Sequence, residues 1–385
     1  MLNKYKIIIL NETKNLFMKN RITYVFVKGR KEKYLSKSYE ATDFFYGLTS
    51  FDSINNIINI IEFDNETTLF RKLVYYVDRF FNKFISLPFY MHRILSLKNL
   101  NTLIKTDNLV LVNESTAFSL LPFLLILKLF FKTNITLFVM GMYSKKIHYP
   151  IFYLIHKLLI NLVNFCVDNV LFLGKGEFEY AKKSTNKILN FHYFPFAVDT
   201  NFWENDDSPK KNQILFIGND GNKNFELVKQ IAQNLQNLSI IIVTNSNIFD
   251  DFQERSNVKI FKGEWGSNKI TDSQLKQFYS ESIVTILPLR NSVQPSGQSV
   301  ALQSMSIGTP VLISKTEGFW DKDNFIDQED IFFIDDDDYK SWLKKIYILT
   351  SSKPMLEKVS LNSKAKVRDK LNEQVFFTNL LKYIT

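Results

Sequence analysis

Two glycine-containing turns in the second half of the sequence have the residue types of a phosphate-binding site. The first lies in ILFIGNDGNKNFELV, where an apolar run of strand length leads through Gly218, Asn219 and Lys223 into a segment of helical periodicity. A glycine turn lets backbone N–H groups and the positive end of a helix approach an anion, and a lysine there adds a full charge. The pattern is neither GxGxxG nor a Walker loop, so it also fits a plain turn with Lys223 in solvent.

The second turn opens the segment PSGQSVALQSMSIG, residues 295–308, for which we expect a helix over 297–307. The residues that would present amides or hydroxyls to an anion at this helix start are Ser296, Gly297, Gln298 and Ser299. Gln303 lies one turn after Ser299 on the same face, and Arg290 lies close by in the sequence. Two helix starts of this kind predict a diphosphate ligand.

In the first half, Glu114 follows an apolar strand and is the candidate for orienting a hydroxyl group of an acceptor. A carboxylate that caps the next helix explains this residue equally well. No spacing supports a nucleophilic triad, and the carboxylate run 335–338 fits the start of a helix better than a metal site.

The elements that must position these residues follow from the alternation of apolar runs with helical segments. We expect strands over 22–27, 57–63, 108–112, 134–140, 169–173, 188–194, 213–217, 239–244, 258–261, 283–288, 310–314 and 331–334. Helices are expected over 223–237, 272–279, 339–350 and 361–384 besides 297–307. This rhythm predicts an α/β protein of two Rossmann-like, doubly wound parallel-sheet domains that face each other across a cleft, with ligand at the carboxyl ends of the strands.

A polar stretch after Trp203 is the best candidate for a linker between these domains. The predicted domains are an N-terminal domain over 1–200 and a C-terminal ligand-binding domain over 201–365; the resemblance described below puts the acceptor side in the first of them. The remaining helix, over 366–385, is expected to pack back towards the N-terminal domain.

Composition and charge limit the function classes. With 45% apolar and 23% charged residues, the chain is not disordered, collagenous or a coiled coil, and its single cysteine favours a reducing, cytoplasmic compartment. Residues 1–200 have 26 basic against 15 acidic residues, a net charge of +11, whereas residues 201–385 have 22 against 24. The basic half could attract an anionic membrane surface or simply keep the protein soluble. Its charges are scattered, which argues against nucleic acid as a partner.

Apolar runs at 117–131 and 151–167 are interrupted by polar residues, so neither has the uninterrupted length of a spanning helix. We expect buried helices there, or helices that dip one face into a bilayer.

Three segments of the second half resemble the glycosyltransferases of the GT-B fold, family 4 in particular. FPFAVDTNFW, residues 194–203, is similar to the segment before the interdomain linker, FIGNDGNKN to the phosphate loop, and SGQSVALQSMSIGTPVLIS to the donor helix with its following strand. In the first half, ATDFFYGL at residues 41–48 and the order of the strands share the resemblance.

The resemblance implies transfer of a sugar from a nucleotide-sugar donor, held by the second domain, to a glycan or lipid-linked acceptor, as in polysaccharide biosynthesis. It implies retention of configuration and no metal requirement, with Lys223 and Arg290 neutralising the diphosphate and Glu114 on the acceptor side. Such an enzyme would be cytoplasmic or peripheral at the inner face of the membrane.

The sequence departs from the family pattern at three positions. Asn219 stands where family 4 usually has a basic residue, and Pro295 and Gln303 stand where it usually has two glutamates. Because Gln303 is neutral, its bond to a ribose would be weaker than that of a carboxylate. A non-catalytic protein that binds a nucleotide or glycan therefore remains an alternative, as does a nucleotide-sugar epimerase.

Overall fold

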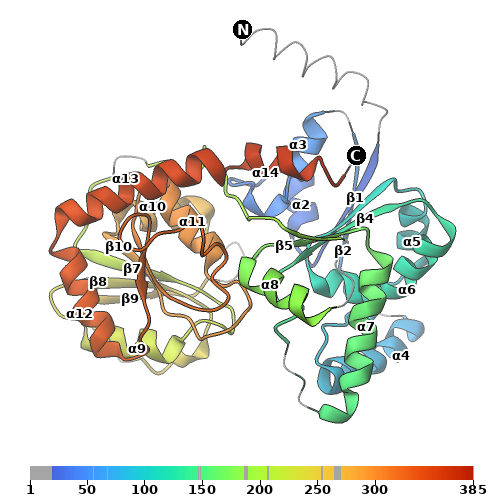
Figure 1. Cartoon of the computed structure of the whole chain (residues 1–385), viewed down its shortest axis with the longest axis horizontal. Helices are drawn as coiled ribbons and strands as arrows, with labels where there is room; N and C mark the ends of the chain where they lie inside the picture. Colours follow the sequence, from blue (N-terminus) through green and yellow to red (C-terminus); the bar gives the residue numbers. More distant parts are fainter. Residues whose placement is uncertain are drawn as a thin grey trace, which may run out of the picture.

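The structure, a computed structural model, describes residues 20–54, 56–66, 68–145, 147, 149–185, 190–205, 208–252, 255–263 and 270–384. These residues form two six-stranded parallel sheets, each flanked by helices and placed side by side (Figure 1). All twelve strands expected from the sequence are present among the described residues.

The first sheet has the strand order β2-β1-β3-β4-β5-β6. Its strands are β1 (Arg21–Phe26), β2 (Ile57–Glu62), β3 (Asn108–Leu111), β4 (Asn134–Val139), β5 (Asn169–Phe172) and β6 (Phe191–Tyr193). Its helices are α2 (Arg30–Ser36), α3 (Leu48–Ser53), α4 (Leu69–Phe80), α5 (Leu97–Leu103), α6 (Glu114–Phe130), α7 (Tyr153–Cys166) and α8 (Lys175–Ser184). Short helical turns are η1 (Asp43–Phe45), η2 (Phe81–Ile85), η3 (Met91–Arg93) and η4 (Pro150–Phe152).

The second sheet has the order β12-β11-β10-β7-β8-β9. Its strands are β7 (Gln213–Ile217), β8 (Ser239–Val243), β9 (Val258–Phe261), β10 (Val284–Leu287), β11 (Val311–Ser314) and β12 (Phe332–Ile334). Its helices are α9 (Phe225–Asn234), α10 (Asp272–Glu281), α11 (Gln298–Ile307), α12 (Tyr339–Thr350), α13 (Lys353–Lys370) and α14 (Glu373–Leu380), with the short turn η5 (Asn247–Phe249). Because the residues of β7, β10 and β11 are buried throughout, these strands are near-continuous apolar runs, as expected of a sheet covered on both faces.

The C-terminal region differs from the single helix expected over 361–384. The chain forms α13 and then α14, because Asn372 breaks the helix and its side chain accepts a hydrogen bond from the amide of Val375 at 2.9 Å. Helix α14 lies against the first domain, where the rings of Phe377 and Phe51 are 4.9 Å apart. Beyond α14, the carbonyl of Tyr383 accepts a hydrogen bond from Asn134 Nδ2 at 2.6 Å.

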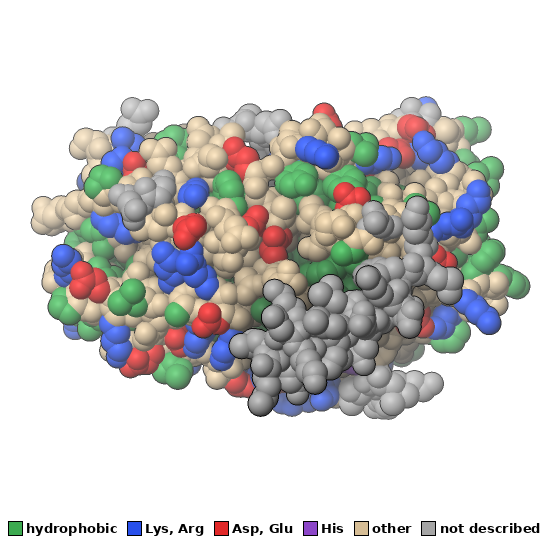
Figure 2. Space-filling model, turned by 90° about the horizontal axis from the view of Figure 1, so that it is seen from above, with side chains coloured by type: hydrophobic (Ala, Val, Ile, Leu, Met, Phe, Trp, Pro, Cys, Tyr) green, Lys and Arg blue, Asp and Glu red, His purple; other side chains and the backbone are tan. Residues whose placement is uncertain are grey.

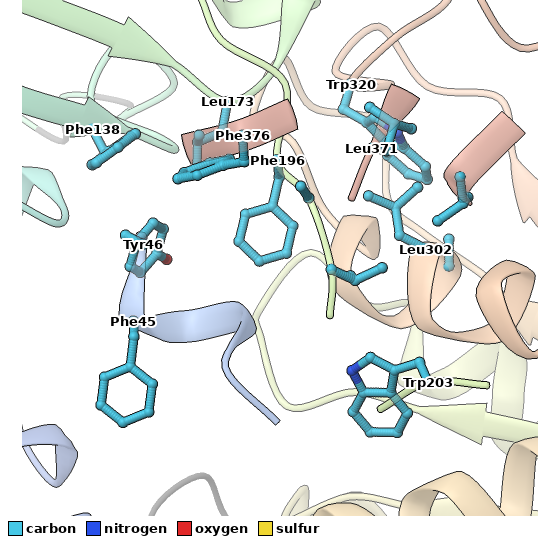
Figure 3. Close-up of a cluster of buried hydrophobic side chains, with 14 of the residues drawn as sticks. Phe45, Tyr46, Phe138, Leu173, Phe196, Trp203, Leu302, Trp320, Leu371 and Phe376 are labelled. Carbon is cyan, nitrogen blue, oxygen red and sulfur yellow. The ribbon is translucent and has the colours of Figure 1, made fainter. Parts of the chain in front are cut away.

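A single cluster of buried apolar residues runs from one domain into the other (Figure 3). Tyr46 and Phe138 contribute from the first domain, Phe196 from the connecting segment, Leu302 from α11 and Phe376 from α14. The two domains are therefore joined by a shared core as well as by the chain itself.

Candidate active site

The candidate site lies where the order of the second sheet reverses. Strands β7 and β10 are neighbours, but the chain continues from β7 to β8 on one side and from β10 to β11 on the other. Ligands of doubly wound proteins bind at such a switch point, at the carboxyl ends of the strands. The loops that leave the two strands are bonded together, since the amide of Asn224 donates to Pro288 O at 2.9 Å and that of Arg290 to Asn222 O at 2.8 Å.

Lys223 lies in the first of these loops and is almost fully buried. Its Nζ donates to Asp220 Oδ2 at 2.8 Å and to Ser296 Oγ at 2.9 Å, and Ser296 Oγ donates in turn to Asp220 Oδ1 at 3.0 Å. Gly218 is needed here, because a Cβ at that residue would lie 2.6 Å from Lys223 Cε. The reading of this segment as a plain turn with Lys223 in solvent is therefore wrong.

Burial and pairing shift the pKa values of this ion pair. Burial lowers the pKa of the Lys223 ammonium below its ordinary value, although Asp220 acts to raise it. Burial acts to raise the pKa of Asp220, but the Lys223 charge and the hydrogen bonds from Lys223, Asn222 and Ser296 together outweigh it, so the pKa of Asp220 is lowered. The two side chains are held together at the carboxyl end of β7.

The second predicted turn has the expected form. Helix α11 begins at Gln298 after Gly297, whose φ of +73° is the left-handed conformation that glycine adopts readily. The helix ends at Gly308, as predicted. The side chain of Ser296, immediately before this helix, contacts Lys223 of the other loop, so the two helix-start junctions meet.

A cavity of about 300 Å³ opens beside these junctions, between the two domains. Predicted residues that line it are Gly218, Asn219, Lys223, Gly297, Ser299 and Gln303. Apolar residues of the second domain form another part of its wall, including Ile217, Val243, Ile270, Leu275 and Val300. Ligand pockets combine a mostly apolar lining with a few polar groups in this way.

The first domain contributes cavity residues that the sequence interpretation missed. They are Arg30, Lys33, Tyr39, Phe44 and Phe45. Arg30 and Lys33 lie in α2, directly after the first strand, so the rule that ligands lie at the carboxyl ends of strands could have found them. They add two basic side chains to the wall of the cavity that also holds Gly218 and Lys223.

Asn219 occupies the family's basic position, and its contacts give it a structural role. Its Nδ2 donates to Gly263 O at 2.8 Å, and its Oδ1 accepts from the amide of Asn245 at 2.6 Å. The side chain therefore joins the loops that follow β7, β8 and β9.

Four predicted residues do not line the cavity: Ser296, Arg290, Gln298 and Glu114. Arg290 is exposed; Gln298 Nε2 donates to Leu173 O in the first domain at 3.0 Å. Glu114 is buried at the start of α6, where burial raises its pKa. The buried carboxyl of Glu177 lies near it. Burial, together with the charge of Glu114, raises the pKa of Glu177 to about 8.

Pro295 and Gln303, at the family's two glutamate positions, both contact the first domain. The ring of Pro295 lies so near Gly174 that a Cβ at that glycine would be 2.7 Å from it. Gln303 Nε2 donates to Asp43 Oδ2 at 2.7 Å, and its Oε1 accepts from the hydroxyl of Tyr279 at 3.1 Å.

Asp43 explains why residue 303 is an amide. This buried carboxylate of η1 also accepts hydrogen bonds from Trp203 Nε1 at 2.7 Å and from the amide of Asp199. Burial raises the pKa of Asp43 to about 7, although these donors act to lower it. A glutamate at 303 would place a second carboxylate against the first, whereas Gln303 supplies a donor. The Gln303 side chain thus lines the cavity while it bonds to the first domain.

No family model matches the sequence, and no curated protein matches it either. Solved structures match the fold. Sucrose-phosphate synthase from Thermosynechococcus elongatus has a TM-score of 0.66 at 12% identity, covering 94% of this chain and 98% of that chain. HepE from Anabaena, solved with UDP and glucose, has a TM-score of 0.65 at 11% identity, covering 95% and 99%. The N-terminal domain of Candida albicans trehalose-6-phosphate phosphatase has a TM-score of 0.60 at 10% identity, covering 95% and 96%.

The fold is GT-B. The predicted fold class, two Rossmann-like domains across a cleft, is confirmed by the two parallel sheets and by these neighbours. Family 4 membership stays a prediction. Because one GT-B neighbour is named as a domain of a phosphatase, the fold by itself leaves the activity open and the site must decide it.

Proposed function

We propose that this protein is a glycosyltransferase that moves a sugar from a nucleoside-diphosphate sugar to a glycan or lipid-linked acceptor. The observation that carries the proposal is the meeting of two helix-start junctions, through Lys223 and Ser296, at the edge of the interdomain cavity. Backbone amides and a fixed ammonium there would stabilise a departing diphosphate, because they are in place before charge develops. HepE, which shares the fold, is named as a complex with UDP-glucose, and that supports a nucleotide-sugar donor.

In the proposed reaction the protein's own cations neutralise the leaving group. Lys223 contacts the diphosphate directly, and Arg30 and Lys33 approach it from the first domain. This arrangement needs no metal ion. Retention of configuration follows by analogy with family 4, and the enzyme would work in the cytoplasm or at the inner face of the membrane.

Thermal unfolding with uridine, guanosine and adenosine diphosphate sugars tests the donor site. We expect one base to raise the melting temperature, equally with and without a chelator, because a ligand that binds the folded state stabilises it by mass action. Val300→Trp, which fills the cavity, should abolish that shift, and Gln230→Trp on the exposed face of α9 should preserve it. No shift with any donor, or one that requires added metal, would contradict the proposal.

A non-catalytic nucleotide-binding protein is the second candidate, favoured by Pro295 and Gln303, which leave both family glutamate positions without a carboxylate. Incubation of the protein with the donor that binds, followed by analysis for free sugar or transferred glycan, separates the two. Turnover excludes the second candidate, and binding without turnover excludes the first. Nuclear magnetic resonance of the product then gives the anomeric configuration.

A further inference from the structure

Helix α4 directs most of its apolar residues to solvent, while two of its charged residues, Arg71 and Asp78, point to the core. Leu73 and Tyr76 are 64% and 69% exposed, whereas Arg71 and Asp78 are 5% and 1% exposed. Beside Tyr75, the exposed apolar residues of the helix form one stripe: Leu69, Phe70, Leu73, Tyr76, Val77 and Phe80. This is the reverse of the usual amphipathic helix of a water-exposed surface.

Hydrogen bonds fix α4 in this orientation. Arg71 pairs with Asp64, and Arg71 Nη1 donates to Glu66 O at 3.2 Å. Asp78 Oδ2 accepts from the amide of His92 at 2.9 Å and contacts His92 Nδ1 at 2.6 Å. Rotation of the helix to bury its apolar stripe would expel both partnered charges from the core, so the outward apolar face is built into the fold.

Helix α7 extends the apolar face. Its inward residues include His156 and Val163, and its exposed apolar residues, with those of η4 before it, are Ile151, Tyr153, Leu154, Ile155, Leu158 and Phe165. Ring contacts join the two helices: Phe80 and Phe84 each lie 5.8 Å from Phe152. We call the exposed apolar residues of α4, η4 and α7 the α4–α7 face; both helices lie at the lower right of Figure 1.

Within the segments that form this face the exposed charged residues are all basic, whereas Asp64 and Glu66, which precede α4 and pair with Arg71, are 38% and 76% exposed. Residues 68–93 and 149–166 are all described, and their exposed charged side chains are Lys72, Arg79, Lys83, Arg93 and Lys157. Arg79 lies over the ring of Tyr75 at 5.9 Å and Lys83 over that of Phe84 at 5.3 Å. On the face seen in Figure 2, by contrast, basic and acidic side chains are interspersed over the second domain at the left.

We propose that the α4–α7 face docks onto a lipid bilayer that contains anionic headgroups. The apolar stripes would enter the boundary between headgroups and acyl chains, and the basic side chains would reach the phosphates around them. A second copy of the chain fits less well, because a two-fold contact through this face would place basic rim against basic rim. Among the described residues no helix is long and apolar enough to span a bilayer.

This inference rests on the proposed function, because docking would bring the enzyme to a lipid-linked acceptor. Of the two apolar runs noted in the sequence, α6 is largely buried except for Leu129 and Phe130 at its end, whereas α7 exposes an apolar face. The part of the face on α4 lies in a segment that was not a candidate. Vesicle binding needs no donor, so docking and sugar transfer can fail separately.

Sedimentation of the full chain with vesicles tests the proposal. We expect the protein to pellet with vesicles of equimolar phosphatidylcholine and phosphatidylglycerol at low salt, and far less with phosphatidylcholine alone. The triple variant Leu73→Ser, Tyr76→Ser, Leu154→Ser should partition at least about tenfold more weakly, because it removes apolar side chains that would enter the bilayer. Leu361→Ser, a change of an equally exposed leucine on α13, is the matched control and should bind as the parent does.

Depth of insertion gives an independent measurement. Brominated lipid should quench the additional fluorescence of Tyr76→Trp, relative to the parent chain, only if α4 enters the membrane. Light scattering of the parent and the triple variant shows whether a second copy of the chain covers the α4–α7 face instead of a bilayer. Failure of the parent to bind anionic vesicles, equal binding by the triple variant, or a parent dimer that the triple variant dissociates would each overturn the proposal.

Discussion

The two sides of the cleft hold buried charged groups in different ways. Lys223 pairs with Asp220, three residues away in the sequence, and with Ser296 on the adjacent loop. Asp43 takes its hydrogen bonds from residues 156, 160 and 260 positions away. The first cluster is local to the second domain, whereas the second joins the first domain, the connecting segment and α11.

This difference in partners indicates a difference in role. Asp220 is 47% exposed, so its contact with Lys223 can rearrange when an anion enters the cavity. Asp43 is enclosed and all its donors are protein groups, so a change there acts on domain contact and stability. Three substitutions test the distinction.

Removal of the Lys223 charge should have the largest effect, on turnover. Lys223→Met keeps the aliphatic contact with Gly218 but loses the ammonium, and we expect kcat/KM to fall about 10²–10³-fold, as when one stabilising donor is removed from a transition state. Initial-rate kinetics with the donor that binds gives the value. Lys229→Ala on α9 is the control, and similar rates for the parent and Lys223→Met would show that the phosphate assignment is wrong.

Gln303→Glu should act on stability instead, and in a pH-dependent way. The new carboxyl faces Asp43, so we expect about 3 kcal/mol of destabilisation at alkaline pH, where neither group keeps a proton. A carboxyl whose pKa is raised in the folded state contributes stability at pH values below its unfolded pKa. That stability is lost as the pH rises through the pKa that the group has in the folded state. The difference from the parent should therefore be small near pH 3.8 and grow as pH passes the value of about 7 that burial gives Asp43.

Urea unfolding of Gln303→Glu across this pH range measures the difference. Gln298→Glu is the matched control, because Gln298 lies on the same helix and is similarly buried but bonds to the carbonyl of Leu173. The loss of stability in Gln298→Glu should not change as the pH passes the pKa of Asp43. A pH-independent loss for Gln303→Glu would mean that the Asp43 contact does not govern residue 303.

Asp220→Asn should have the smallest effect. Without the carboxylate, Lys223 loses its ionic partner, so we expect about 1 kcal/mol lower stability without ligand but several-fold tighter binding of a nucleoside diphosphate. Isothermal titration gives the affinity, and Asp250→Asn, which removes the exposed pair with Lys262, is the control. Weaker binding by Asp220→Asn would indicate that Asp220 itself positions the ligand.

How well the sequence predicted a feature depends on whether that feature rests on local or on distant contacts. The strands and the helix at Gly297 were predicted closely, because apolar periodicity, glycine turns and helix stops act over a few residues. Arg30 and Lys33 were missed, because the turn before them has one glycine, Gly29, and no further signature of a ligand site. The break at Asn372 was missed because the apolar pattern continues on both sides of it.

Hydrophobic pattern and turn chemistry alone determined two parallel sheets and a glycine turn with Lys223 that leads into a helix start. Only the tertiary structure decided that Lys223 is enclosed, that Pro295 and Gln303 contact the first domain, and that α4 turns its apolar side outward. The reason is that a side chain's partner across a domain boundary is set by how the layers pack, and residues hundreds of positions apart leave no periodic trace of that contact.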